Sequence, residues 1–179
     1  MRSAVPAKTF CSMVAAVFAH GGTLDKFIGD AIMATFGTPE TAPDDARRAV
    51  AAAIAMRGAL AGLNRERAAA GRSAIAHGIA IHYGPVVVGN VGTAERLEYT
   101  VIGDTVNVAA LIAELCKPTG EDLLISEAVR EQLGDTVATR AVPVERLRGR
   151  QSPVAVHAID AGVGDVSGDN VRPDFGREG

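Results

Sequence analysis

The segment GGTLDKFIGDAIMATF, which runs from Gly21 to Phe36, carries the most structural information in this sequence. Its two halves, Thr23–Phe27 and Ala31–Phe36, are short runs rich in β-compatible residues. Gly29-Asp30 lies between them, and glycine followed by aspartate suits a tight hairpin turn. The pattern predicts a β-hairpin with Asp30 at its tip, where the carboxylate can point outward.

Helical patterns flank this hairpin on both sides. Apolar residues recur at helical spacing in Pro6–His20, and Gly21-Gly22 supplies a stop. On the other side, the acidic pair Asp44-Asp45 opens the Ala-rich stretch Ala46–Ala70, which ends at Gly71. We predict a helix on each side, of which the second is the longer.

The second half of the chain alternates between strands and helices. Ala74–Tyr83 and Pro85–Val91 are expected to be neighbouring strands joined by a turn at Gly84. The further predicted elements are a strand Leu97–Ile102, a helix Asp104–Cys116 ended by Lys117-Pro118-Thr119-Gly120, a strand Leu123–Ile125, a helix Ser126–Leu133, and strands near Val137–Val142 and Val154–Ile159. Hairpins between adjacent strands favour an α+β fold, with helices packed on one antiparallel or mixed sheet, over a doubly wound parallel sheet.

Length and composition indicate one soluble domain over residues 1–160. The chain has 179 residues, of which 47% are hydrophobic and 22% are charged, an ordinary globular balance. Residues 161–179 are rich in Gly and Asp, and we expect a disordered tail there. The formal net charge is -3, so the chain has no excess of Lys and Arg with which to bind the phosphate backbone of nucleic acid. Nucleic acid is therefore not an expected partner.

The cysteines and apolar runs point to a cytoplasmic protein. Cys11 and Cys116 lack metal-ligand spacing and are interpreted as buried small hydrophobic residues in a reducing compartment. The longest apolar runs are interrupted by Arg47, Arg48 and Arg57, so no membrane segment is predicted in this chain. The sequence leaves open whether a neighbouring segment carries a membrane anchor.

Three segments, Gly21–Ala34, Gly78–Gly92 and Glu98–Asn107, closely resemble the catalytic domain of class III adenylate and guanylate cyclases. The resemblance runs in order from about Phe10 to Ile159. It implies the ferredoxin-like nucleotide cyclase fold and formation of cyclic AMP and pyrophosphate from ATP in signal transduction. It further implies two ions, Mg²⁺ or Mn²⁺, and a head-to-tail homodimer or a heterodimer with another cyclase domain. In such dimers the metal aspartates and the base-reading residues of one site come from different subunits.

The resemblance assigns roles to three residues around the hairpin and the later strand. Asp30 matches one of the two metal-binding aspartates of the family. Lys26 matches the position that donates a hydrogen bond to an adenine ring nitrogen, and Thr100 matches its partner position, so both favour ATP over GTP. The alternatives are a turn aspartate, a solvated lysine and an ordinary β-branched strand residue.

Two further positions match the family with less support. Asn107 matches the asparagine that binds the ribose region and helps position the reacting hydroxyl, a catalytic role; the alternative is an amide bonded to nearby backbone. Arg148 falls where the family uses a lysine for the triphosphate, and an ordinary exposed basic turn explains it equally well.

The sequence also departs from the family in two places. No Phe-x-Asp-Ile segment precedes Phe10, so we expect the first strand and the first metal aspartate to be missing. Leu111 occupies the position of an arginine that stabilises charge in the transition state. We therefore expect an impaired adenylate cyclase, with a catalytically inactive nucleotide-binding or dimerisation module regulating a partner cyclase, or a truncated remnant, as the alternatives.

Overall fold

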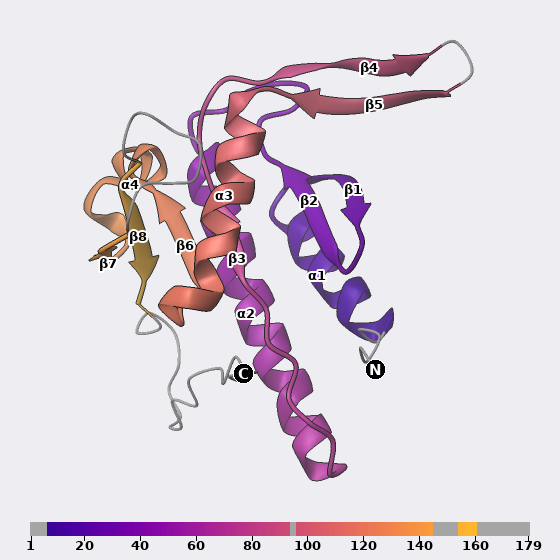
Figure 1. Cartoon of the computed structure of the whole chain (residues 1–179), viewed down its shortest axis with the longest axis vertical. Helices are drawn as coiled ribbons and strands as arrows, with labels where there is room; N and C mark the ends of the chain where they lie inside the picture. Colours follow the sequence, from indigo (N-terminus) through magenta and orange to yellow (C-terminus); the bar gives the residue numbers. More distant parts are fainter. Residues whose placement is uncertain (1–6, 94–95, 145–153, 161–179) are drawn as a thin grey trace. The chain divides into compact units, whose positions relative to one another are not determined.

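The computed structural model describes residues 7–93, 96–144 and 154–160 (Figure 1). The chain divides into two compact units. Unit 1 comprises the described residues of Met1–Ile75 and Val86–Gly103, and unit 2 those of Ala76–Pro85 and Asp104–Gly179. The predicted tail and Arg148 lie outside the described residues.

Unit 1 begins with the predicted helix and hairpin. Helix α1 (Ala7–Ala19) is followed by the antiparallel strands β1 (Thr23–Ile28) and β2 (Ala31–Thr35). Ile28 pairs with Ala31 across the turn, and Gly29 has a φ of 61°, a left-handed conformation that glycine adopts without a Cβ penalty. The hairpin prediction is confirmed, with Asp30 exposed at its tip.

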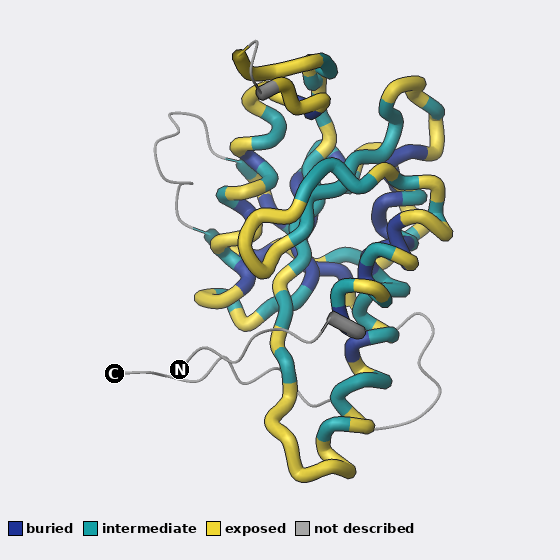
Figure 2. Tube along the Cα trace, turned by 90° about the vertical axis from the view of Figure 1, so that its right-hand side faces the viewer, coloured by how far each residue is buried: buried dark blue, intermediate teal, exposed yellow. Residues whose placement is uncertain are grey.

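Helix α2 (Asp45–Ala69) packs against α1. The buried residues of α2 lie between Asp45 and Leu60, and most of them are alanines. Figure 2 colours the buried stretches of the chain dark blue. Small side chains let the two helices approach closely. From α1, Met13, Ala16 and Val17 contribute to the apolar core of this unit.

Strands β4 (Val87–Thr93) and β5 (Arg96–Ile102) complete unit 1 as an antiparallel ribbon. The predicted pairing of Pro85–Val91 with Ala74–Tyr83 through a turn at Gly84 is wrong. At Gly84 the chain lies against the start of the next helix, because Thr105 donates a hydrogen bond to the Pro85 carbonyl at 2.6 Å. A Cβ on Gly84 would lie 2.7 Å from the Thr105 hydroxyl oxygen, so this glycine serves close packing instead of a hairpin.

Unit 2 is built on a mixed four-stranded sheet in the order β3-β6-β8-β7. Strand β3 (Ile79–Ile81) runs parallel to β6 (Leu123–Ser126), and the other pairs are antiparallel. The remaining elements of the unit are α3 (Asp104–Thr119), α4 (Glu127–Leu133), the short 3-10 helix η1 (Gly134–Thr136), β7 (Thr139–Val142) and β8 (Val156–Ile159). Its core joins α3 to the sheet through Val108, Ile112, Cys116, Leu124, Val142, Val156 and Ala158.

Two element boundaries differ from the prediction for local reasons. Strand β3 is much shorter than Ala74–Tyr83, because both backbone polar groups of Ile75 bond to the Asn64 side chain instead of a strand. Helix α3 continues through Pro118 to Thr119. A proline in the last turn removes only one intrahelical bond, and the helix ends at Gly120, whose φ is 71°.

The α+β class is confirmed, although the described strands form three separate sheets and not one. Cys116 is buried as predicted, and burial raises the pKa of its thiol to about 11. The same prediction for Cys11 is wrong, since that residue lies on an exposed face of α1. No helix in the described ranges combines the length and the apolar character needed to cross a membrane.

Candidate functional site

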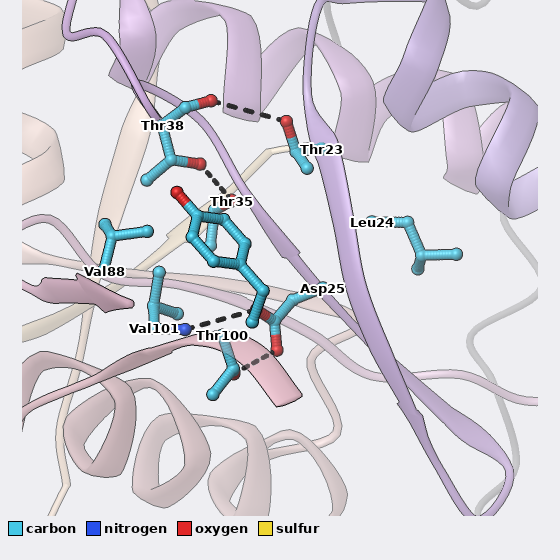
Figure 3. A pocket seen from close by; sticks show the side chains of 9 residues that line it. Thr23, Leu24, Asp25, Thr35, Thr38, Val88, Thr100 and Val101 are labelled. Carbon is cyan, nitrogen blue, oxygen red and sulfur yellow. Dashed lines mark hydrogen bonds between the residues drawn. The ribbon is translucent and has the colours of Figure 1, made fainter. Parts of the chain in front are cut away.

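A β-bulge in β1 turns the Asp25 side chain toward β5. The pairing passes from Leu24 with Ala34 to Lys26 with Met33, so Asp25 is the extra residue without a partner in β2. Bulges commonly redirect a side chain in this way. The Asp25 carboxylate accepts hydrogen bonds from the Thr100 hydroxyl at 2.8 Å and from the Val101 backbone N–H at 3.3 Å (Figure 3).

The ammonium group of Lys26 lies beside the same carboxylate. Its Nζ is 3.7 Å from Asp25 Oδ2 and 3.5 Å from Glu98 Oε2. The Lys26 side chain is 35% exposed, whereas that of Asp25 is only 6% exposed. Asp25 Oδ2 therefore joins a buried hydroxyl on β5 to a partly exposed cation on β1.

A small cavity lies next to this cluster. It measures about 60 Å³ and is lined by the apolar residues Leu24, Val88 and Val101 together with Thr23, Asp25, Thr35, Thr38, Tyr99 and Thr100. Figure 3 marks the hydrogen bond between the hydroxyls of Thr35 and Thr38, whose oxygens are 2.6 Å apart. This volume holds about two water molecules, so the cavity can receive an edge of a ligand and does not enclose a purine ring.

Asp30 offers a single exposed carboxylate at the hairpin tip. Within the described ranges no group of three or more His, Cys, Asp and Glu side chains forms a metal-binding cluster. Mg²⁺ is nevertheless often held by one or two carboxylates together with substrate phosphates and water. The exposure of Asp30 suits that kind of shared ligation.

A model of the adenylate and guanylate cyclase catalytic domain family matches residues 11–159. The chain belongs to this family. The match includes described residues of both units and every candidate site residue named from the sequence.

Several cyclases are similar to this chain. Adenylate cyclase 1 of Rhizobium meliloti is 35% identical over 143 residues, which cover 80% of this chain and 22% of that protein. The crystal structure of the adenylyl cyclase CyaB from P. aeruginosa matches with a TM-score of 0.78 and 30% identity, over 89% of this chain and 82% of that one. The guanylyl cyclase Cya2 matches with a TM-score of 0.72 and 35% identity, over 84% and 76%. The chain spans about a quarter of the length of the curated relatives it matches.

In this cyclase domain, the structure brings two of the predicted site residues together within unit 1. Lys26 and Thr100 both adjoin Asp25, although they lie far apart in the sequence. Asn107 is exposed in the first turn of α3, in unit 2. Leu111 lies one turn later and packs, partly buried, against the core of unit 2.

Sequence reasoning missed Asp25, the residue that connects the two. One signal was present, since aspartate is depleted in strand interiors and here stands inside the run Thr23–Phe27 beside a lysine. The bulge that gives Asp25 its orientation depends on the pairing register of β1 with β2. That register is not visible in a single strand's sequence.

Proposed function

We propose that this chain is an adenylate-cyclase-like domain that binds ATP and forms cyclic AMP and pyrophosphate in signal transduction. The convergence of Lys26 and Thr100 on Asp25 carries the proposal. Two side chains from separate strands adjoin one carboxylate oxygen, at 3.7 Å and 2.8 Å. An ammonium and a hydroxyl set side by side can recognise a base edge that carries an acceptor next to a donor.

Adenine is the purine whose edge fits a lysine donor. Its ring nitrogen N1 accepts a hydrogen bond and its exocyclic amino group donates one. Guanine offers a ring N–H and a carbonyl at the corresponding positions, so a lysine would there face another donor. The 35% exposure of the Lys26 side chain supports this role, because part of the side chain is open to a ligand.

Asp30 is proposed as a ligand for Mg²⁺ or Mn²⁺ together with the triphosphate. When bound, the cation would neutralise negative charge on the reacting phosphate. Asn107 is proposed to contact the ribose and orient the 3′-hydroxyl, and its exposed position on α3 supports access to a ligand. Arg148 is proposed to bind phosphate, and it lies outside the described residues.

A homodimer, or a heterodimer with another cyclase domain, is part of this proposal. Strands of unit 1 expose several large apolar side chains, among them Phe27, Ile28, Leu97 and Tyr99, which are 55% to 65% exposed. Contiguous exposed apolar surface is typical of protein interaction sites. A partner subunit would bury these residues.

A second function, a catalytically inactive module that binds nucleotide and regulates a partner cyclase, is favoured by Leu111. This residue has no charge or hydrogen-bonding group, and its side chain packs against apolar neighbours in unit 2. The stabilisation that an arginine supplies to a transition state is commonly several kcal/mol. We therefore propose low turnover for the chain alone.

The experiment is a product assay with purified protein, ATP and Mn²⁺, with cyclic AMP quantified by mass spectrometry and GTP supplied in a parallel reaction. Slow formation of cyclic AMP from ATP supports the enzyme. Nucleotide binding without any product supports the regulatory module. Absence of both product and binding would overturn the two proposals together.

A further inference from the structure

The hydrogen-bond polarity of Thr100 is fixed by Asp25. A threonine hydroxyl has one proton to donate and lone pairs that accept, and a carboxylate accepts only. Because Thr100 donates its proton to Asp25 Oδ2 at 2.8 Å, the same hydroxyl can only accept from a ligand. The lone pairs of the Thr100 oxygen are therefore left to accept a hydrogen bond from a ligand.

Burial keeps this polarity from reversing. Thr100 is 5% exposed and the Asp25 side chain 6% exposed, so water does not readily replace either partner. Asp25 Oδ1 is held by the Val101 N–H at 3.3 Å, which anchors the carboxylate to the backbone of β5. Leaving a buried carboxylate oxygen without its donor is unfavourable, and the hydroxyl therefore stays turned toward Asp25.

Asp25 also helps to place the neighbouring donor, together with Glu98, whose Oε2 lies 3.5 Å from Lys26 Nζ. Lys26 Nζ lies 3.7 Å from the Oδ2 atom that accepts from Thr100. One oxygen thus holds an acceptor-only hydroxyl and a donor-only ammonium next to each other. Both Asp25 oxygens have protein donors and the side chain is only 6% exposed. Little of this carboxylate is open to a ligand, so its effect on a ligand passes through its neighbours.

We infer that Asp25 is a specificity-determining positioning residue that makes the Lys26 and Thr100 pair selective for adenine over guanine. The inference rests on the proposed function. Adenine meets the lysine with a ring-nitrogen acceptor and the threonine with an amino donor. Guanine opposes a ring N–H to the ammonium and a carbonyl oxygen to the threonine lone pairs, so both contacts fail.

The decisive variant is Asp25→Asn, because an asparagine of the same shape reverses the polarity of Thr100. With its oxygen held by the Val101 N–H, the asparagine would turn its NH₂ group toward the Thr100 hydroxyl. That hydroxyl would then accept from the asparagine and have its own proton free for a guanine carbonyl. We expect the preference for ATP over GTP to fall about tenfold or more.

The measurement is competition of ATP and of GTP against a fluorescent ATP analogue in the presence of Mn²⁺, using the whole chain. The readout is the ratio of the two dissociation constants. If Asp25 were merely structural, Asp25→Asn would lower the melting temperature or weaken the binding of ATP and of GTP by the same factor. A ratio of dissociation constants that does not change would overturn the inference. Arg47→Glu, at an exposed position of α2, is the matched control and should leave the ratio unchanged.

A second pair of variants tests the same chemistry if Asp25→Asn does not fold. Thr100→Ser keeps the hydroxyl and should retain the preference for ATP, whereas the nearly isosteric Thr100→Val should lose it. A Thr100→Val protein that still prefers ATP to the original extent would overturn the inference, since Asp25 acts on the base through that hydroxyl.

The outcomes separate this inference from the proposed function. If the unaltered chain binds no nucleotide and forms no product, both are overturned. If it forms cyclic AMP from ATP but binds ATP and GTP equally, only the inference about Asp25 is overturned. A third outcome is that the unaltered chain prefers ATP, that Lys26→Glu removes this preference and that Asp25→Asn leaves it intact. That outcome overturns only the role of Asp25.

Discussion

Lys26 lies between two carboxylates and yet keeps its ammonium group available. Its partners, Asp25 and Glu98, are 3.7 Å and 3.5 Å away, and the lysine side chain is 35% exposed. The Glu98 side chain is 49% exposed, and ion pairs between exposed groups typically contribute about 0–1 kcal/mol to stability. The lysine can therefore exchange part of this pairing for a ligand at little cost to the fold.

Replacing Lys26 with glutamate should weaken ATP binding at least tenfold. The change removes a donor and places a third carboxylate beside Asp25 and Glu98, so it also repels the triphosphate. Arg47→Glu makes the same change of charge at an exposed position of the same unit and should bind ATP normally. Titration of each protein with a fluorescent ATP analogue measures the effect, and equal affinities would remove the adenine assignment.

Asp30→Asn should abolish the Mn²⁺ dependence of nucleotide binding while changing the free energy of unfolding by no more than about 0.5 kcal/mol. Asparagine tolerates turn conformations as well as aspartate does, so the hairpin should survive, but a neutral amide is a poor ligand for a hard cation. Nucleotide titrations with and without Mn²⁺, together with thermal unfolding, check both parts. Retained metal dependence would show that the cation binds elsewhere.

At the residue scale the sequence named the two residues proposed to read the base, but not the residue that joins them. Lys26 and Thr100 were named from their motifs, and they do adjoin one carboxylate. Asp25 could not be assigned, because its orientation follows from a shift in the pairing of β1 with β2. A shift of one residue moves a side chain to the other face of a strand, and nothing in the β1 segment alone specifies it.

Helix α3 contains both a candidate catalytic position and the main departure from the family. Asn107 is exposed, whereas Leu111, one turn later, packs against the unit 2 core. The helix uses Val108, Ile112 and Cys116 for the core itself, and Leu111 lies at the margin of that apolar face. A long side chain there can cover the core with its stem and extend its polar end outward.

Leu111→Arg should raise the rate of cyclic AMP formation in a complex with a cyclase domain that carries both metal aspartates. A guanidinium at this position supplies the charge that leucine lacks, and the loss of apolar packing should reduce the free energy of unfolding by about 1 kcal/mol. Leu111→Met preserves the apolar character of this position and is the control, for which we expect no increase in the rate. The rate is measured at saturating ATP and Mn²⁺, and no increase with arginine would contradict the alignment of α3.

The start of helix α4 carries a pH-sensitive ion cluster. Glu127 accepts a hydrogen bond from Arg130 Nε at 2.8 Å and is also bonded to His157. The bond from Arg130, followed by that from His157, lowers the pKa of Glu127 from 4.5 to about 2. A carboxyl whose pKa is lower in the folded chain stabilises the fold above its unfolded pKa.

Glu127→Gln should therefore lower the melting temperature at pH values above about 4.5, and the difference from the unaltered chain should close as the pH falls through about 2. Below that value both proteins carry a neutral side chain at this position. Glu131→Gln, at an exposed position of the same helix, is the comparison variant. Circular dichroism melts at several pH values test this, and a gap that persists unchanged to pH 2 would contradict it.

At the element scale, local patterns predicted the helices and the first hairpin well, and the pairing of the later strands poorly. The hairpin of β1 and β2 and the helices α1, α2 and α4 follow from spacing, turn residues and caps. The pairing of β3 with β6 joins strands that are separated in the sequence by β4, β5 and α3. Parallel strands require such a crossover, and no local signal identifies the partner, which is why the neighbouring Val-rich run was wrongly paired with β3.

At the scale of the whole molecule, both units carry candidate site residues. Unit 1 provides Lys26, Asp30 and Thr100, while Asn107 belongs to unit 2. The family match over residues 11–159 draws on both. Relatives of similar identity include an adenylyl and a guanylyl cyclase, so membership of the family does not decide which base this chain selects. The proposal assigns that choice to the cluster around Asp25.

The direct measurement is a competition experiment on the unaltered chain, in which ATP and GTP each displace a fluorescent ATP analogue at a fixed concentration of Mn²⁺. A site that pairs the Lys26 ammonium and the Thr100 lone pairs with adenine predicts displacement by ATP at a concentration at least about tenfold lower than by GTP. Equal displacement by the two nucleotides, or displacement by GTP at the lower concentration, would contradict it.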